Sequence, residues 1–162
     1  MKKNAKKSSE PDTGFSDMAK IADGLADVLG DTYVLTIKTH ACHWNVVGPQ
    51  FYSIHKLTED QYGDLFAAAD ELAERIRALG HFAPANMKAL ADHAAMSEGK
   101  ESPDAEELVE GLVASHENIS RRLHDLISVA EKGGDAVTAD LATERAAFHE
   151  KAAWMLRAMV AG

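Results

Sequence analysis

Residues 38–57 read KTHACHWNVVGPQFYSIHKL, and this stretch separates two long amphipathic segments. Apolar residues recur every three or four positions on both sides of it, which is the pattern of a helix with one buried face. Gly48-Pro49 interrupts the pattern, and proline is favoured at the first position of a new helix. We therefore expect one helix over residues 16–46, capped by Ser16, and a second over residues 49–79, opened by Pro49. The apolar positions of the second segment include Phe51, Ile54, Tyr62, Leu65, Phe66, Leu72, Ile76 and Leu79.

Two more helices are expected in the second half of the chain. One opens at Ser102-Pro103 and ends at Gly133-Gly134, since serine caps helices and glycine ends them. The other begins near Thr138 and runs to the C-terminus. The long connection before them can hold a short helix over residues 85–94. This order predicts an all-α fold, a ferritin-like four-helix bundle with a short helix in the crossover between the second and third long helices.

The charge is divided unevenly along the 162 residues, whose net charge is −9. Residues 1–12 hold four lysines against two acidic side chains, whereas the remaining 150 residues hold 13 basic and 24 acidic ones. A leader of this composition cannot build a core, so we expect residues 1–13 to be a mobile tail and residues 14–162 to form the ferritin-like domain. The four lysines are Lys2, Lys3, Lys6 and Lys7.

Several classes of protein are disfavoured by the sequence. No apolar stretch follows the N-terminal lysines, so they do not begin a secretory signal. No run approaches the roughly 18 apolar residues of a membrane span, so no membrane partner is expected. The only cysteine, Cys42, cannot form an internal disulfide, and the default compartment is a reducing cytoplasm.

Histidines and carboxylates suggest a metal site of an unusual kind. Ordinary ferritin-like di-iron sites use Glu-x-x-His motifs, but no glutamate here has a histidine three residues later. What remains is His43, His55, Asp70 and Glu74, with Glu59 four residues after His55. Imidazoles and carboxylates suit Fe(II), and zinc is a possible competitor. His55 and Asp70 are separated by about 22 Å along one helix, so a shared metal ion would require two chains.

Each of these residues also has a simpler interpretation when it is taken alone. Asp70 and Glu74 can be solvated helix residues that pair with Arg75 or Arg77. His55 can be a partly buried polar side chain.

The combined spacing closely resembles that of the Dps family, the mini-ferritins named for DNA protection in starved cells. The matching elements are His-Trp-Asn-Val, Gly-Pro-x-Phe, a second histidine after twelve residues, and then DELAERIRALG at residues 70–80. HEKAAWMLRA at residues 149–158 is similar to the last helix of that family. The resemblance covers nearly the whole chain beyond the leader.

This resemblance implies a hollow homododecamer that oxidises Fe(II), preferentially with hydrogen peroxide rather than oxygen, and stores an Fe(III) mineral. It implies ferroxidase sites that take His43 and His55 from one subunit and Asp70 and Glu74 from its neighbour. Glu74 would bridge or bind the tighter iron, and Glu59 would hold a second, weaker iron or a water molecule. Protection of DNA from oxidative damage would follow.

Two further residues of the opening stretch keep alternatives open. Trp44 can supply an electron near the site or simply pack in the core. His40 can act behind the metal ligands, as an auxiliary metal ligand, or as a hydrogen-bonded histidine at an interface.

The resemblance also implies iron entry through acidic three-fold pores near the junction of the last two helices. The candidates are Glu131, Asp135, Asp140 and Glu144, although Ala136 occupies a position that is often acidic in relatives. An alternative for Asp140 is a favourable interaction with the helix dipole.

Some relatives bind DNA through lysine-rich tails, which would make a nucleoid-associated, DNA-compacting particle the alternative function. Twelve tails would act together, in a salt-dependent manner, whereas the acidic body would oppose binding.

Overall fold

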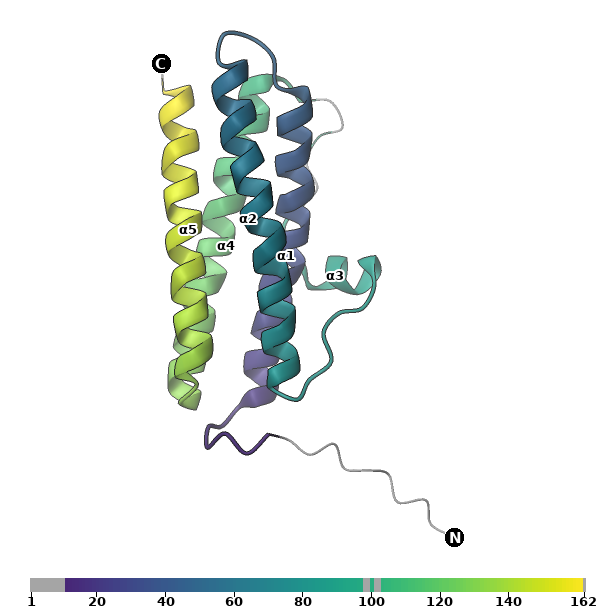
Figure 1. Ribbon diagram of the computed structural model, residues 1–162, viewed down its shortest axis with the longest axis vertical. Helices are drawn as coiled ribbons and strands as arrows, with labels where there is room; N and C mark the ends of the chain where they lie inside the picture. Colours follow the sequence, from purple (N-terminus) through teal and green to yellow (C-terminus); the bar gives the residue numbers. More distant parts are fainter. Residues whose placement is uncertain (1–10, 98–99, 101–102, 162) are drawn as a thin grey trace.

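The protein is described here by a computed structural model that covers residues 11–97, 100 and 103–161. This part of the chain contains helices and no strands. The helices are α1 (Met18–Asn45), α2 (Phe51–Ala78), α3 (Met87–His93), α4 (Ala105–Gly133) and α5 (Ala136–Val160). The four long helices run alongside one another, and short α3 lies beside α1 within the crossover (Figure 1). The predicted all-α bundle and its crossover helix are therefore confirmed.

The bundle is held together by large apolar side chains that lie along the facing sides of the long helices. Leu25, Leu65, Leu112 and Leu156 are fully buried, and burying each such side chain contributes about 1.5–3 kcal/mol. Phe66 departs from the expected pattern because its side chain is 67% exposed on the outward face of α2. No helix in the described ranges is long and apolar enough to cross a membrane.

The predicted starts of the first two helices are wrong by about two residues. Ser16 does not cap α1, because the helix begins after Asp17, which occupies the N-cap position. The backbone N–H of Ser16 donates to the carbonyl of Gly133 at 2.9 Å. Pro49 precedes α2 rather than opening it. Gly48 has a positive φ of 100°, and its carbonyl accepts from the N–H of Phe51 in a turn that delays the helix.

The last two helices begin at acidic caps that were not predicted. Asp104 caps α4 in a capping box with Glu107, while the expected cap, Ser102, lies outside the described residues. Asp135 caps α5 by accepting from the N–H of Thr138 at 3.0 Å. The final helix therefore begins two residues before Thr138.

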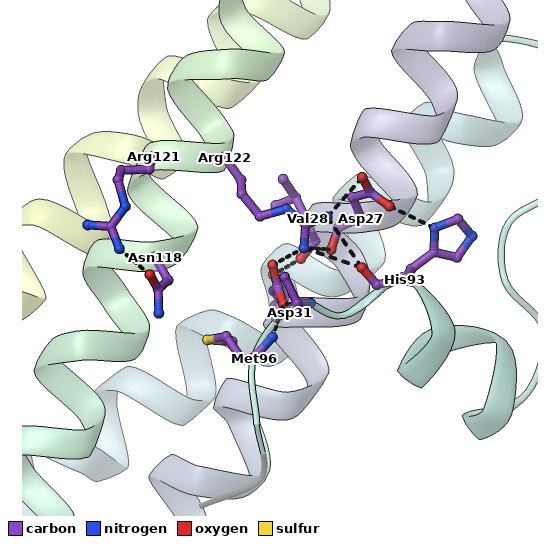
Figure 2. Close-up of polar contacts among 10 residues, drawn as sticks. Asp27, Val28, Asp31, His93, Met96, Asn118, Arg121 and Arg122 are labelled. Atoms are coloured by element: carbon purple, nitrogen blue, oxygen red, sulfur yellow. Dashed lines mark hydrogen bonds and ion pairs between the residues drawn. The ribbon is translucent and has the colours of Figure 1, made fainter.

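A partly buried ion-pair cluster connects the crossover to the bundle, as Figure 2 shows. Asp31 of α1 is fully buried, pairs with Arg122 of α4 and accepts from the N–H of Ala95 at 2.8 Å. Arg122 also reaches Asp27 at 2.8 Å, and Asp27 accepts from Nδ1 of His93 at 2.9 Å. The cluster thereby links α1, α4 and the end of α3.

A second polar pair lies inside the bundle between α4 and α5. His116 and His149 are buried, and their Nδ1 atoms are 2.9 Å apart, so one ring donates and the other accepts. Burial, together with the smaller effect of the charge of Arg145, lowers the pKa of His116 to about 3. Both rings are therefore neutral near pH 7.

Candidate metal centre

His43 and His55 hold each other at the junction of α1 and α2. Nδ1 of His43 lies 2.8 Å from the carbonyl oxygen of His55, and Nδ1 of His55 lies 2.9 Å from the carbonyl oxygen of His43. The two rings stack with their centroids 3.7 Å apart and their planes 16° apart. The turn at Gly48-Pro49 thus brings together the two histidines that the sequence places twelve residues apart.

These reciprocal bonds define which ring nitrogen can bind a metal. A carbonyl oxygen can only accept a hydrogen bond, so each Nδ1 must carry the proton. Nε2 of each neutral imidazole then keeps its lone pair, which is the form that ligates metals. Backbone carbonyls commonly orient metal-binding histidines in this way. The pair therefore presents two oriented nitrogen ligands from one chain.

Aromatic side chains surround the pair. Tyr62 of α2 lies edge-on to His43, with centroids 5.2 Å apart, and Phe51 stacks on His55 at 5.1 Å. The position of Tyr62, seven residues after His55, places it on the same face of α2. In the sequence, Tyr62 was counted among the apolar positions of this helix and therefore as a core residue. Only its separation of seven residues from His55, about two helical turns, could have indicated that it lies beside the histidine pair.

His40 and Trp44 extend this aromatic cluster toward the surface. His40 stacks on Trp44 with centroids 5.1 Å apart and also contacts Tyr62 at 4.2 Å. Trp44 is 66% exposed, so the structure rules out core packing within this chain. No side-chain hydrogen bond of His40 occurs in the described ranges, where it is instead a stacking residue.

Glu59 is half-buried near the two histidines. Its carboxylate pairs with Lys56, and the hydrogen bond and charge of Lys56 lower the pKa of Glu59. A metal that recruits Glu59 would therefore compete with this lysine.

Asp70 and Glu74 lie in the second half of α2 and are exposed. They do not pair with the two arginines considered as partners. Arg75 pairs with Asp135 at 2.7 Å, and Arg77 donates to the carbonyl of His81. Within the residues that the structure covers, neither carboxylate has an ion-pair partner, so both are available at the surface.

A single chain does not bring these ligands together. His55 and Asp70 belong to one continuous helix, so their separation of about 22 Å stands. The described part of the chain contains no group of three or more His, Cys, Asp or Glu side chains able to hold a metal ion. The histidine pair and the two carboxylates therefore lie at separate places on each chain.

The acidic residues predicted for a pore divide into two groups. Glu131, Asp140 and Glu144 are exposed and remain candidates. Asp135 is no longer a candidate for the pore, because its side chain is buried, caps α5 and pairs with Arg75. Burial alone would raise the pKa of Asp135, but hydrogen bonds from Thr138 and Arg75 outweigh it and lower the pKa.

The family can now be identified. The sequence model of the ferritin-like domain matches residues 22–161. The chain is 33% identical over 138 residues to the DNA protection during starvation protein of Helicobacter pylori, covering 85% of this chain and 96% of the relative. It belongs to the Dps family.

Lys2, Lys3, Lys6 and Lys7 of the predicted tail lie outside the described residues.

Another relative matches in sequence, and a solved structure matches in fold. The uncharacterized low temperature-induced protein all0458 of Nostoc is 39% identical over 136 residues, covering 83% of this chain and 76% of the relative. The Dps structure from Vibrio cholerae, described as a member of a broad superfamily of ferritin-like diiron-carboxylate proteins, superposes with a TM-score of 0.83. That structure is 30% identical in sequence, with 88% of this chain and 90% of that chain covered.

Proposed function

We propose that this protein is a ferroxidase that oxidises Fe(II), preferentially with hydrogen peroxide, and stores the Fe(III) product inside a hollow dodecamer. The observation that carries the proposal is the reciprocal lock between His43 and His55, which leaves two Nε2 atoms oriented for a metal. The exposed carboxylates of Asp70 and Glu74 supply the complementary half-site. Each complete site therefore combines two histidines of one chain with two carboxylates of another.

The chemistry balances without release of a radical. Two Fe(II) ions each give one electron to hydrogen peroxide, its O–O bond breaks, and two protons are taken up to yield two water molecules. Neutral imidazole and carboxylate ligands bind the substrate Fe(II), and the carboxylate charge favours the Fe(III) product. The result is consumption of iron and peroxide together, which fits a protein related to one named for DNA protection during starvation.

The carboxylate half-site can be tested without disturbing the fold. Glu74→Gln and Asp70→Asn should each abolish the excess rate of Fe(II) oxidation by peroxide over buffer, because each removes a proposed ligand. Both side chains are exposed and unpaired in the described chain, so neither substitution should disturb the helix. Glu71→Gln is the matched control, since it removes a neighbouring exposed carboxylate of the same helix. Unchanged rates in the two ligand variants would remove the proposed site.

The sharing of the site between chains has its own test. His43→Asn removes Nε2 while its amide can still donate to the carbonyl of His55. Chains with His43→Asn and chains with Glu74→Gln should be inactive separately. When they are unfolded, mixed equally and reassembled, random pairing gives about one quarter of the sites both intact half-sites. Recovery of about that fraction of activity supports shared sites, and no recovery contradicts them.

Iron entry is assigned to the exposed acidic residues near the start of α5. Asp140→Asn should slow iron uptake into assembled particles, because a carboxylate that attracts Fe(II) is lost. Equal uptake by the variant and the unmodified particle would contradict a role in iron entry. The interaction of Asp140 with the dipole at the helix N-terminus would then be its only role.

A second candidate function is DNA binding through the tail. It rests on the four lysines among residues 1–12, which contrast with the acidic remainder of the chain. A gel-shift at low salt should show complex formation by the full-length protein and none by protein lacking residues 1–12. A shift that survives the deletion would exclude the tail as the binding element.

A further inference from the structure

A groove of about 920 Å³ lies between the second half of α1 and the first half of α4, beside residues 95–97 of the crossover. Its volume falls within the roughly 300–1,000 Å³ that is usual for small-molecule sites. Neither the histidine pair nor Asp70 and Glu74 belong to its lining, so the groove is separate from the candidate metal centre. Its side chains therefore need an explanation other than the proposed iron chemistry.

Small side chains leave the space between α1 and α4 open at this level of the bundle. Asp31 and Arg122 join the two helices further along, whereas Ala41, Gly111 and Ala114 line the groove. A Cβ added at Gly111 would meet nothing within 4 Å, so no close packing in the described chain requires a glycine there. Glycine also weakens a helix interior relative to alanine. The groove is therefore open because the residues that line it are small.

Lys38 of α1 places a half-buried ammonium group in this groove. Its Nζ donates to Oγ of Ser115 at 2.7 Å, and that hydroxyl donates in turn to the carbonyl of Gly111. An ammonium has three N–H donors, so the bond to Ser115 leaves two of them. Burial lowers the pKa of Lys38, and no carboxylate in the described ranges pairs with it to oppose this effect. Lysines that leave water are usually paired, so Lys38 lacks the partner that its burial calls for.

The other charges of the lining do not balance Lys38. Glu107 pairs with Lys100, so its charge is already matched. Glu110 is exposed, and charges in contact with water are strongly screened. Lys38 is the charge that remains, and it favours an anion in the groove.

Apolar side chains lie along the same groove. Ile37, the neighbour of Lys38 in the sequence, is 58% exposed although it lies well inside α1. Met96 of the crossover and Leu108 of α4 are partly buried and also belong to the lining. A ligand that suits this groove therefore combines a negative charge with an apolar body.

We propose that this groove binds a small organic anion, a carboxylate with an apolar body, whose acid group pairs with Lys38. The two remaining N–H groups of Lys38 donate to the carboxylate, and the apolar body lies against Ile37, Met96 and Leu108. The ligand is a free small molecule, because one groove of small-molecule size holds both the charge and the apolar surfaces. It supplies the charged partner that Lys38 lacks. The proposal does not depend on iron.

The test is a fluorescence titration of the iron-free, full-length protein with two matched probes. One is 8-anilinonaphthalene-1-sulfonate, and the other is N-phenyl-1-naphthylamine, which has the same rings without the sulfonate. Lys38→Met should weaken binding of the sulfonate about tenfold or more, the usual effect of losing a hydrogen bond to a charged group. The same substitution should change binding of the uncharged probe by less than about twofold, because the apolar walls remain.

Variants that fill the groove test its position. Gly111→Leu should weaken binding of both probes, because its side chain occupies the open space beside α4. Ala41→Leu fills the groove from α1 and replaces it if Gly111→Leu fails to fold. Lys88→Met is the matched control, because Lys88 is an exposed lysine of α3 outside the lining. It should leave binding of both probes unchanged.

Competition identifies the chemistry of the ligand. Octanoate, a carboxylate with an apolar chain, should displace the sulfonate probe, whereas inorganic phosphate at equal ionic strength should not. Displacement by phosphate as effective as that by octanoate would contradict a site for an apolar body.

Circular dichroism and particle mass identify variants that fold and assemble like the unmodified protein. Among these, equal sulfonate binding by Lys38→Met and the unmodified protein overturns the role of Lys38. If Lys38→Met is unfolded, Lys38→Gln repeats the comparison, since its amide can still donate to Ser115 without a charge. Unchanged binding of both probes by a filling variant shows that the probes bind elsewhere and overturns the site. An equal loss of binding in Lys88→Met would do the same.

Discussion

Acidification should destabilise this bundle through the buried pair His116 and His149. Burial holds the pKa of His116 at about 3 in the folded chain, against an ordinary value of 6.5. Between these values the unfolded chain binds a proton and the folded chain does not, so stability is lost as the pH falls below 6.5. The loss is about 1.4 kcal/mol per pH unit, or roughly 3 kcal/mol for His116 alone at pH 4.5. His149, whose pKa is also lowered by burial, adds to it.

The assay is urea unfolding from pH 7 to pH 4.5 at fixed protein concentration, since assembly also contributes to stability. Carboxylates titrate in the same range, so the comparison must be made with a variant that lacks only the histidines. His116→Gln with His149→Gln keeps two polar side chains that can bond each other but do not titrate above pH 3. The unmodified chain should lose at least about 3 kcal/mol more than this variant. Equal losses would refute the assignment of acid sensitivity to the pair.

Three further variants probe the contacts that shape the bundle. Gly30→Ala should destabilise the chain by about 1–3 kcal/mol in urea, because its Cβ would lie 2.5 Å from the crossover backbone; an unchanged midpoint would show that the crossover moves freely. Asp31→Asn should speed hydrogen exchange at the N–H of Ala95, which donates to that carboxylate, and equal protection would deny it an anchoring role. Asp135→Ala should cost roughly 3 kcal/mol or more, since it removes a helix cap and strands the charge of Arg75; a loss below 1 kcal/mol would contradict this.

Much of the fold follows from periodicity in the sequence. Leu25 and Leu65 recur at helical spacing and are fully buried, as predicted. Helix starts were less predictable because they depend on tertiary contacts. The N–H of Ser16 donates to the carbonyl of Gly133 at the end of α4, more than a hundred positions away in the sequence. The buried cap at Asp135 likewise depends on Arg75 of another helix.

The candidate site could be predicted only in part. The resemblance to the Dps family implied that His43 and His55 act together on one subunit, and the structure places their rings in contact. The assignment of Asp70 and Glu74 to the other half stays a prediction, because it concerns a second chain. The stacking of His40 was not predictable, because it depends on how the side chains of α1 and α2 face each other.

The reciprocal histidine bonds give the ring of His55 a structural role beside its proposed role as a metal ligand. Its ring donates to the carbonyl of His43, which lies in the last turn of α1 and has no partner within that helix. Any residue that lacks this donor therefore leaves the carbonyl at the end of α1 without its hydrogen bond, whatever its effect on metal binding. A histidine at this position in a related sequence therefore does not by itself indicate metal binding, because the hydrogen bond to the end of α1 is a sufficient reason to keep it. Asp70 and Glu74 have no such structural role in the described chain, so acidic residues at these positions of a relative are the better indicator of the proposed metal site.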